Sequence, residues 1–177
     1  MVGAPGIYKL AWTGSIWTEQ TLYSFGYVSG CDPVGGLIFD ASGNIYGTTN
    51  GCGSNNGGTV FEYILTPPQF KVLYNLPTPG SGCSPFCGSL GKLAMDAAGN
   101  LYGTVASGGA YGGGSVFKLA PENGGWTDTS LHDFGGQGDS DGAFPWCTLV
   151  IDAHGNLYGT TDQGGIYNDG VIFEITH

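Results

Sequence analysis

One short stretch occurs three times in this chain at a constant spacing. Asp40–Asn44 is followed by Ile-Tyr-Gly-Thr, and the stretch returns at Asp96–Asn100 and Asp152–Asn156, each followed by Leu-Tyr-Gly-Thr. The final asparagines of the three copies are 56 residues apart both times. A period this constant indicates a repeat architecture. Each copy is typical of a β-hairpin, with an apolar run, a Gly-Asn turn and a second run.

The composition favours strands over helices. The chain contains 35 glycines, and charged residues make up 10% of it, against roughly 25% in an average soluble domain. No window shows sustained helical periodicity. We therefore predict an all-β chain of short strands and tight turns.

The repeat predicts one domain, residues 1–177, built of three units of four short strands. The units are placed at about 6–57, 58–113 and 114–177, with strand exchange at the ends. Four-stranded antiparallel units in tandem, at roughly 40 to 60 residues each, are typical of β-propeller blades. A stacked β-solenoid is the main alternative, but its repeats are normally shorter.

The propeller interpretation also assigns strands within each blade. We expect the innermost strands to be the most apolar, because neighbouring blades would cover both their faces. They are placed at Leu37–Phe39, Leu93–Met95 and Leu149–Ile151. The outermost strands are placed at Thr21–Phe25, Lys71–Leu76 and Thr129–Phe134.

The predicted strand order leaves both ends of the array incomplete. The chain would start with a third and a fourth strand and stop after a third strand, and three blades are too few to close a ring. Open blade faces and an unpaired edge favour association with other copies. Two copies would give six blades, with strands from one chain's first residues completing the other chain's last sheet. A piece of a longer propeller and an end-to-end filament are the alternatives.

The charge excludes some partners. The formal net charge is −10, with four lysines and no arginine, whereas binding to nucleic acid or to an anionic membrane relies on clustered Lys and Arg. No run of 18 apolar residues is present, so we expect no membrane span.

Five cysteines favour an oxidising compartment, and hence an extracellular or cell-surface location. Cys31 and Cys52 fall in two loops of one predicted rim, separated by one hairpin, so a bridge between them is reasonable. Cys83 and Cys87 could pair locally. This would leave Cys147 free or available to another chain.

Several motifs resemble a known family. They are Asn-Leu/Ile-Tyr-Gly-Thr-Thr, a Gly-rich loop, Gly-Thr-Val-Phe-Lys/Glu-Leu, Leu-Tyr-Ser-Phe and Asp-Gly-x-x-Pro, and they resemble the bacterial GloVer tandem repeats found in choice-of-anchor proteins. The resemblance covers nearly the whole chain. It implies an exported, surface-associated protein with a propeller-like fold and a poorly defined biochemical role.

Two sets of carboxylates could hold a cation. Asp40, Asp96 and Asp152 each stand alone in their turn, so we expect them to accept hydrogen bonds from turn N–H groups instead. Asp139 and Asp141 are two residues apart before a glycine and form a better Ca²⁺ candidate, although no later Glu completes a familiar calcium loop. We otherwise expect no cofactor.

The histidines give little support for catalysis. His132 lies on a predicted outer strand, His154 in a turn and His177 at the end of the sequence, away from a propeller's central site. Nucleophilic catalysis needs a base beside a nucleophile. We therefore expect no enzyme.

The long loops of the three units share one predicted rim, and such loops often carry binding residues. Aromatic rings beside acids could stack on sugars there, or they could simply cover the junctions between blades. The candidate ligand-binding residues are Tyr27, Tyr111, Phe144, Trp146, Tyr167, Asp162 and Asp169.

The sequence therefore favours a non-enzymatic extracellular or surface scaffold that binds itself, as a ring or a filament, and presents a loop-rich rim. A carbohydrate-binding propeller that recognises glycans is the second interpretation. A propeller hydrolase or lyase is the third.

Overall fold

The computed structural model describes residues 5–78, 88, 91–136 and 140–176. All of its named elements are strands, and all the strands pair antiparallel. The predicted all-β class is therefore confirmed. Cys83, Cys87 and Asp139 lie outside the described residues.

The strands form four sheets in which neighbours follow sequence order. The first sheet is a hairpin of β1 (Gly6–Trp12) and β2 (Trp17–Ser24). The second contains β3 (Ile38–Phe39), β4 (Ile45–Thr48), β5 (Thr59–Leu65) and β6 (Pro68–Asn75). The third contains β7 (Ala94–Met95), β8 (Leu101–Val105), β9 (Ser115–Glu122) and β10 (Gly125–Asp133). The last has three strands, β11 (Val150–Ile151), β12 (Leu157–Thr160) and β13 (Ile172–Ile175).

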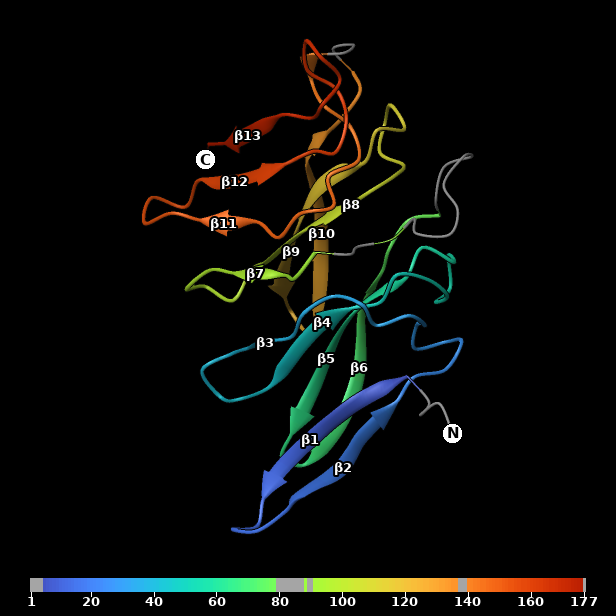
Figure 1. Cartoon of the computed structure of the whole chain (residues 1–177), viewed down its shortest axis with the longest axis vertical. Helices are drawn as coiled ribbons and strands as arrows, with labels where there is room; N and C mark the ends of the chain where they lie inside the picture. The colour runs from blue at the N-terminus through green and yellow to red at the C-terminus, as the bar shows by residue number, and fades with distance from the viewer. Residues whose placement is uncertain (1–4, 79–87, 89–90, 137–139, 177) are drawn as a thin grey trace.

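The sheets lie one above another along the long axis of the molecule (Figure 1). The β1–β2 hairpin is at one end and the β11–β13 sheet at the other. The turns that follow β3, β7 and β11 project to the left in this view, and the longer loops gather on the opposite side. The two sets of connections therefore lie on different sides of the stack, as the predicted strand order requires.

Three apolar clusters hold the neighbouring sheets together. Ile7 and Phe25 of the hairpin region pack with Phe61 and Tyr63 of β5. The cluster between the second and third sheets contains the buried residues Tyr46, Val60, Leu76, Leu93, Leu101, Val105, Phe117 and Leu119. The cluster between the third and last sheets contains Tyr102, Val116, Phe134, Leu149 and Leu157. Each of the two four-stranded sheets therefore packs against a neighbouring sheet on both of its faces.

A glycine on each second strand makes room for an aromatic ring on the third strand. A Cβ added at Gly103 of β8 would lie 2.5 Å from the Phe117 ring, and the equivalent contacts at Gly47 and Gly159 are as close. The ladders place these residues directly opposite each other, at Gly47↔Phe61, Gly103↔Phe117 and Gly159↔Phe173. The Tyr-Gly-Thr motif is thus a packing motif.

The aspartate of each Gly-Asn turn accepts several hydrogen bonds, as predicted. In the first turn, Asp40 accepts bonds from the backbone N–H groups of Ser42 and Asn44, from the Asn44 amide and from the Tyr46 hydroxyl. Asp96 and Asp152 repeat this pattern. Burial alone would raise the pKa of each carboxyl, but the hydrogen bonds outweigh it and lower the pKa, to about 2 for Asp152.

The structure corrects the prediction for the inner strands. β3, β7 and β11 have only two residues each, and Phe39 and Val150 are exposed on them. The most deeply buried strands are instead β4 and β8, every residue of which is buried. The reason is that β3 and β11 belong to the sheets near the two ends of the stack, where no sheet among the described residues covers Phe39 or Val150, whereas β4 and β8 lie inside the stack with a strand on either side.

The bounds of the outer strands also change. β2, β6 and β10 begin three or four residues earlier than predicted, directly after the tight turns that join them to the preceding strands, and end one residue earlier. The sheets follow the predicted strand order: the described chain starts with a two-stranded hairpin, continues with two four-stranded sheets and ends with three strands. Each four-stranded sheet therefore takes its first two strands from one 56-residue unit and its last two from the next.

Candidate functional site: two open end faces and a loop-rich rim

The two ends of the stack expose positions that are buried inside it. Ile172 of β13 lies opposite Thr160, as Val60 lies opposite Thr48 and Val116 opposite Thr104. Val60 and Val116 are 0% exposed, whereas Ile172 is 85% exposed. The difference arises because no further sheet covers Ile172 among the described residues.

We call this surface the C-terminal end face and define it by Val150, Tyr158, Ile172 and Glu174. Val150, Tyr158 and Glu174 are cross-strand partners and so share one side of the sheet. Their neighbours Leu157, Phe173 and Ile175 pack into the stack on the other side. The Tyr158 hydroxyl donates a 2.8 Å hydrogen bond to Glu174, and this bond, with a smaller effect of burial, raises the pKa of Tyr158.

The opposite surface, the N-terminal end face, has two parts. On the hairpin, Tyr8, Leu10, Trp12 and Trp17 are exposed, and the two tryptophan rings lie 5.4 Å apart. Beside it, Leu37 and Phe39 are exposed because, among the described residues, no inner strands accompany the hairpin and cover them. Leu37 is 39% exposed, whereas its equivalents Leu93 and Leu149 are 2% and 3% exposed.

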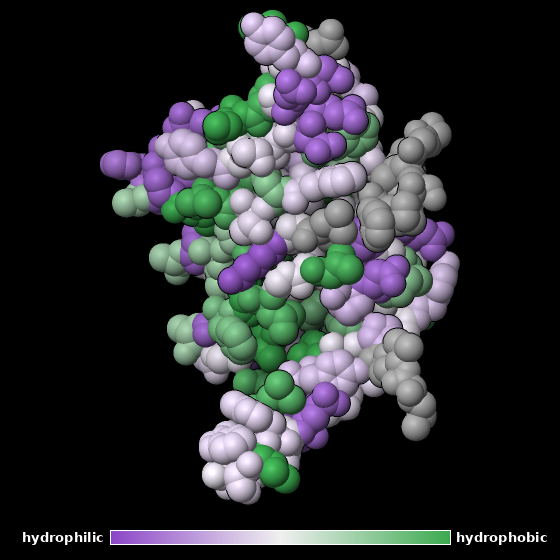
Figure 2. Space-filling view, in the orientation of Figure 1, coloured by the Kyte–Doolittle hydropathy of each residue, from purple (hydrophilic) through white to green (hydrophobic). Residues whose placement is uncertain are grey.

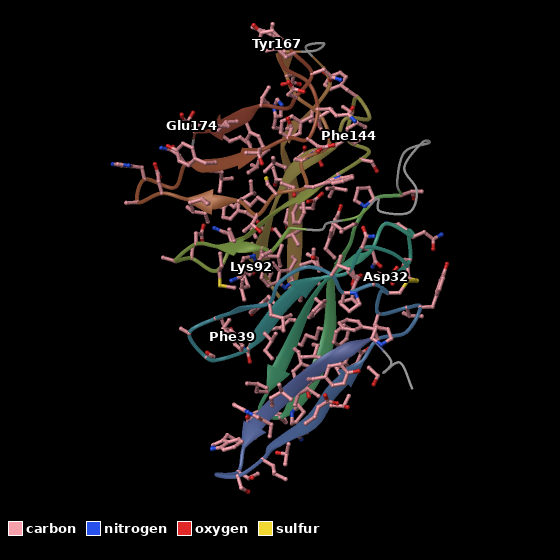
Figure 3. All side chains as sticks on the ribbon, viewed as in Figure 1. Asp32, Phe39, Lys92, Phe144, Tyr167 and Glu174 are labelled. Carbon is pink, nitrogen blue, oxygen red and sulfur yellow. A yellow bond between two sulfur atoms is a disulfide. The ribbon has the colours of Figure 1, made fainter. Side chains whose placement is uncertain are left out.

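Figure 2 shows apolar residues at the surface over β3, above the hairpin. Phe39 is labelled at this place in Figure 3. The N-terminal end face is therefore a broad surface that joins the hairpin to the exposed side of the second sheet.

The structure does not gather the seven candidate ligand-binding residues into one site. Tyr27 donates a hydrogen bond to Asn56 in the β4–β5 loop, and Tyr111 lines a cavity beside β10. Phe144 is half-buried with a positive φ, and its carbonyl accepts a bond from the Asp162 N–H. Tyr167 lies near the tip of the stack, well apart from Phe144 (Figure 3). Trp146 and Asp169 are exposed. The candidates are thus spread over three sheets.

The rim contains one pair that the sequence did not reveal. His132 Nε2 lies 3.0 Å from Asp141 Oδ1, and Asp141 Oδ2 accepts bonds from the N–H groups of Gly135 and Gly136. Both carboxylate oxygens of Asp141 are therefore bonded to residues at the end of β10 or just after it. Within the described residues, no group of three His, Cys, Asp or Glu could hold a metal ion.

A cavity of about 370 Å³ adjoins this pair. The Tyr111 ring forms one wall, against the backbone of Gly136. The other polar lining residues are Ser130, His132, Asp133 and Asp141. The cavity therefore combines one exposed aromatic face with hydrogen-bonding groups.

The cysteines fall into two groups. Cys31 and Cys52 form a disulfide with a Cα–Cα distance of 5.4 Å, as their predicted loop positions favoured. It joins the loop before β3 to the loop after β4. Cys147 is a free thiol, half-buried, and its sulfur accepts a bond from the Thr160 N–H. Within the described ranges, no helix has the length and apolar character of a membrane span.

The fold defines a class of protein: an all-β chain whose antiparallel sheets are stacked in sequence order. The model of the Gloeobacter/Verrucomicrobia repeat matches residues 2–177. The chain therefore belongs to this GloVer repeat family. No curated protein matches the chain at a significant level.

Proposed function

We propose that the chain is a non-enzymatic extracellular scaffold that associates with other copies of itself through its two end faces and presents the loop-rich rim to partners. The observation that carries this proposal is the exposure of Ile172 at a position where Val60 and Val116 are fully buried. Inside the stack, the next sheet covers this position. On the last sheet of the described residues, the same position is open to solvent.

A second copy offers the surface that fits. At each interior junction, the side of a sheet that carries Val60 or Val116 packs against the Phe-containing side of the next sheet. The N-terminal end face is a surface of that second type, with Tyr8 and Leu10 at the positions of Phe61 and Tyr63. Head-to-tail contacts of this kind either close into rings or continue as filaments, depending on the rotation per step.

Ring closure would make the assembly a β-propeller. Each copy has two four-stranded sheets, and if the hairpin of one copy joins the last sheet of the other, a dimer has six sheets, which is within the range of known propellers. The Cys31–Cys52 disulfide and the repeat family support a location outside the cytoplasm. The negative charge disfavours nucleic acid and anionic membranes as partners.

The test is the molecular mass in solution over a wide range of concentration, measured by light scattering and sedimentation velocity. We expect mass to rise with concentration above the 18.2 kDa monomer. Val150→Asp puts a charge on the C-terminal end face and should abolish the rise, whereas Val28→Asp, at an exposed loop position, should preserve it. A wild-type chain that stays monomeric at every concentration would overturn the proposal.

A glycan-binding function is the second candidate, because the cavity beside His132 and Asp141 has the aromatic wall and polar lining that sugars need. A glycan array probes it directly. Tyr111→Ala should abolish any binding through this cavity, and Tyr167→Ala, on another sheet, should not. Binding that survives Tyr111→Ala would exclude the cavity.

A further inference from the structure

We infer that copies join by sharing a sheet: β1 of one copy pairs with β12 of the next and takes the place that β13 holds in the single chain. This inference rests on the proposed self-association and specifies its contacts. The resulting sheet would have four strands, β11 and β12 from one copy and β1 and β2 from the other.

The first step of the argument is that β1 is equivalent to the third strands β5, β9 and β13. The β1–β2 ladder has an irregularity between Ile7 and Tyr8, and β5–β6 has one between Val60 and Phe61. The backbone bond that starts the hairpin also recurs. It runs from Phe25 to Pro5, from Leu76 to Gly58 and from Phe134 to Gly114.

The second step is that β1 and β13 lack complementary neighbours. In the part of the chain that the structure describes, β1 pairs only with β2, so it has no second strand beside it. Within the same described residues, β13 pairs with β12 alone, and no fourth strand lies on its other side. β12 can therefore accept either of two third strands, and β1 already carries its fourth strand with it.

The third step is that β1 has the residues this place requires. The register of the other ladders would put Tyr8 opposite Gly159, where Phe173 now lies, and Lys9 opposite Tyr158. An aromatic ring occupies the equivalent position over a glycine in each of the other sheets. A lysine opposite the tyrosine also occurs in the third sheet, where Lys118 lies opposite Tyr102 and its ammonium is 5.8 Å from the centre of the Tyr102 ring.

The fourth step is that the exchange covers the exposed residues of the second sheet. The two inner strands of a preceding sheet would cover Leu37 and Phe39. Among the described residues, the preceding sheet is the β1–β2 hairpin, which does not include such strands. β11 and β12 of the other copy supply them, with Val150 and Tyr158 facing Leu37 and Phe39. Releasing β13 breaks its four residue pairs with β12. The incoming β1 keeps its seven residue pairs with β2.

Two matched substitutions test the exchange because they remove the ring over Gly159 from the two competing strands. Tyr8→Ser should weaken self-association about tenfold or more, since it damages the incoming strand. Phe173→Ser should leave it unchanged or strengthen it, since it damages only the strand that leaves. Equal weakening by both variants would overturn the inference. The Kd is measured by sedimentation velocity, and far-ultraviolet circular dichroism confirms that each variant is folded.

A crosslink provides a second, independent measurement. A chain with Lys9→Cys and a chain with Tyr158→Cys, both carrying Cys147→Ser, are mixed and oxidised by dissolved oxygen. Directly opposed residues of antiparallel strands have Cα atoms about 4.5 or 5.5 Å apart, within the range of about 4.4–6.8 Å that a disulfide spans. A covalent dimer of the two chains supports the shared sheet, and its absence from a mixture that still associates contradicts it.

Ile172→Asp separates this inference from simple face-to-face stacking of intact end sheets. Stacking needs an apolar residue at Ile172 and should be abolished, whereas the shared sheet releases β13 and should tolerate the charge. If Ile172→Asp abolishes association, the shared sheet is wrong but self-association stands. If the wild-type chain does not associate at all, the proposed function itself is wrong.

Discussion

At each Gly-Asn turn, one aspartate connects the backbone of the turn to the tyrosine of the following strand. The Asp152 carboxylate accepts bonds from the His154 N–H, the Asn156 N–H and amide, and the Tyr158 hydroxyl. A carboxylate that accepts several bonds is favoured over its protonated form. The three turns therefore depend on pH.

The first prediction concerns acid. The pKa of Asp152 is about 2 in the folded chain against 3.8 for an aspartate in the unfolded chain, so its stabilising effect is complete above pH 3.8 and is lost as the pH falls through about 2. We expect the free energy of unfolding, from urea titrations, to fall between these values. Asp152→Asn should make that fall less steep. An unchanged slope would mean that the turn carboxylate is not responsible.

The second prediction concerns the glycine under the aromatic ring. In Gly103→Ala, the new methyl group would lie 2.5 Å from the ring of Phe117, which is only 4% exposed and cannot move aside. Overpacking of this kind costs about 1–3 kcal/mol. We expect a loss of stability in that range from urea unfolding. Gly26→Ala, with no atom within 4 Å of the added Cβ, is the control and should cost much less.

At the scale of the elements, the hairpins could be predicted because their signals are local. A Gly-Asn turn between two apolar runs can be recognised within a dozen residues, and each of the three predicted turns joins two paired strands in the structure. The exposure of β3 and β11 follows from their place near the ends of the array and not from their local pattern, because it depends on whether another sheet lies alongside. Leu37 and Leu93 occupy equivalent positions in the repeat and have very different exposure.

The candidate site shows the same limit. Asp141 was singled out for its spacing from Asp139, but its partners are His132 and two backbone N–H groups of the intervening loop. No pattern encodes the path by which that loop returns to β10. Isolated histidines give no signal until the fold places an acid beside them.

The third prediction concerns the disulfide. Cys31 and Cys52 are 21 residues apart, and a bridge that closes a loop of this length stabilises by about 3 kcal/mol in the chain-entropy model. We expect Cys31→Ser together with Cys52→Ser to lower the free energy of unfolding by about that amount. Reducing agent should lower the Tm of the wild-type chain but not that of the double variant, whereas Cys147→Ser should retain the response.

At the scale of the whole molecule, the stack combines apolar ends with a strongly negative surface. The net charge is −10 and the sequence pI is about 4.2. Every copy that joins an assembly brings this charge close to that of its neighbour. The apolar end faces and the overall charge therefore act in opposite directions.

The last prediction follows from this opposition. The Debye length, over which charge repulsion acts, is about 30 Å at 0.01 M salt and about 10 Å at 0.1 M. The burial of apolar surface does not require low salt. We therefore expect the Kd of self-association to fall as sodium chloride is raised over this range, measured by sedimentation equilibrium at neutral pH. Val150→Asp should not regain association at high salt, because the substitution disrupts the contact itself and does not act through long-range charge repulsion. Association that weakens with salt would instead mean that ion pairs between copies, and not the apolar end faces, hold the assembly together.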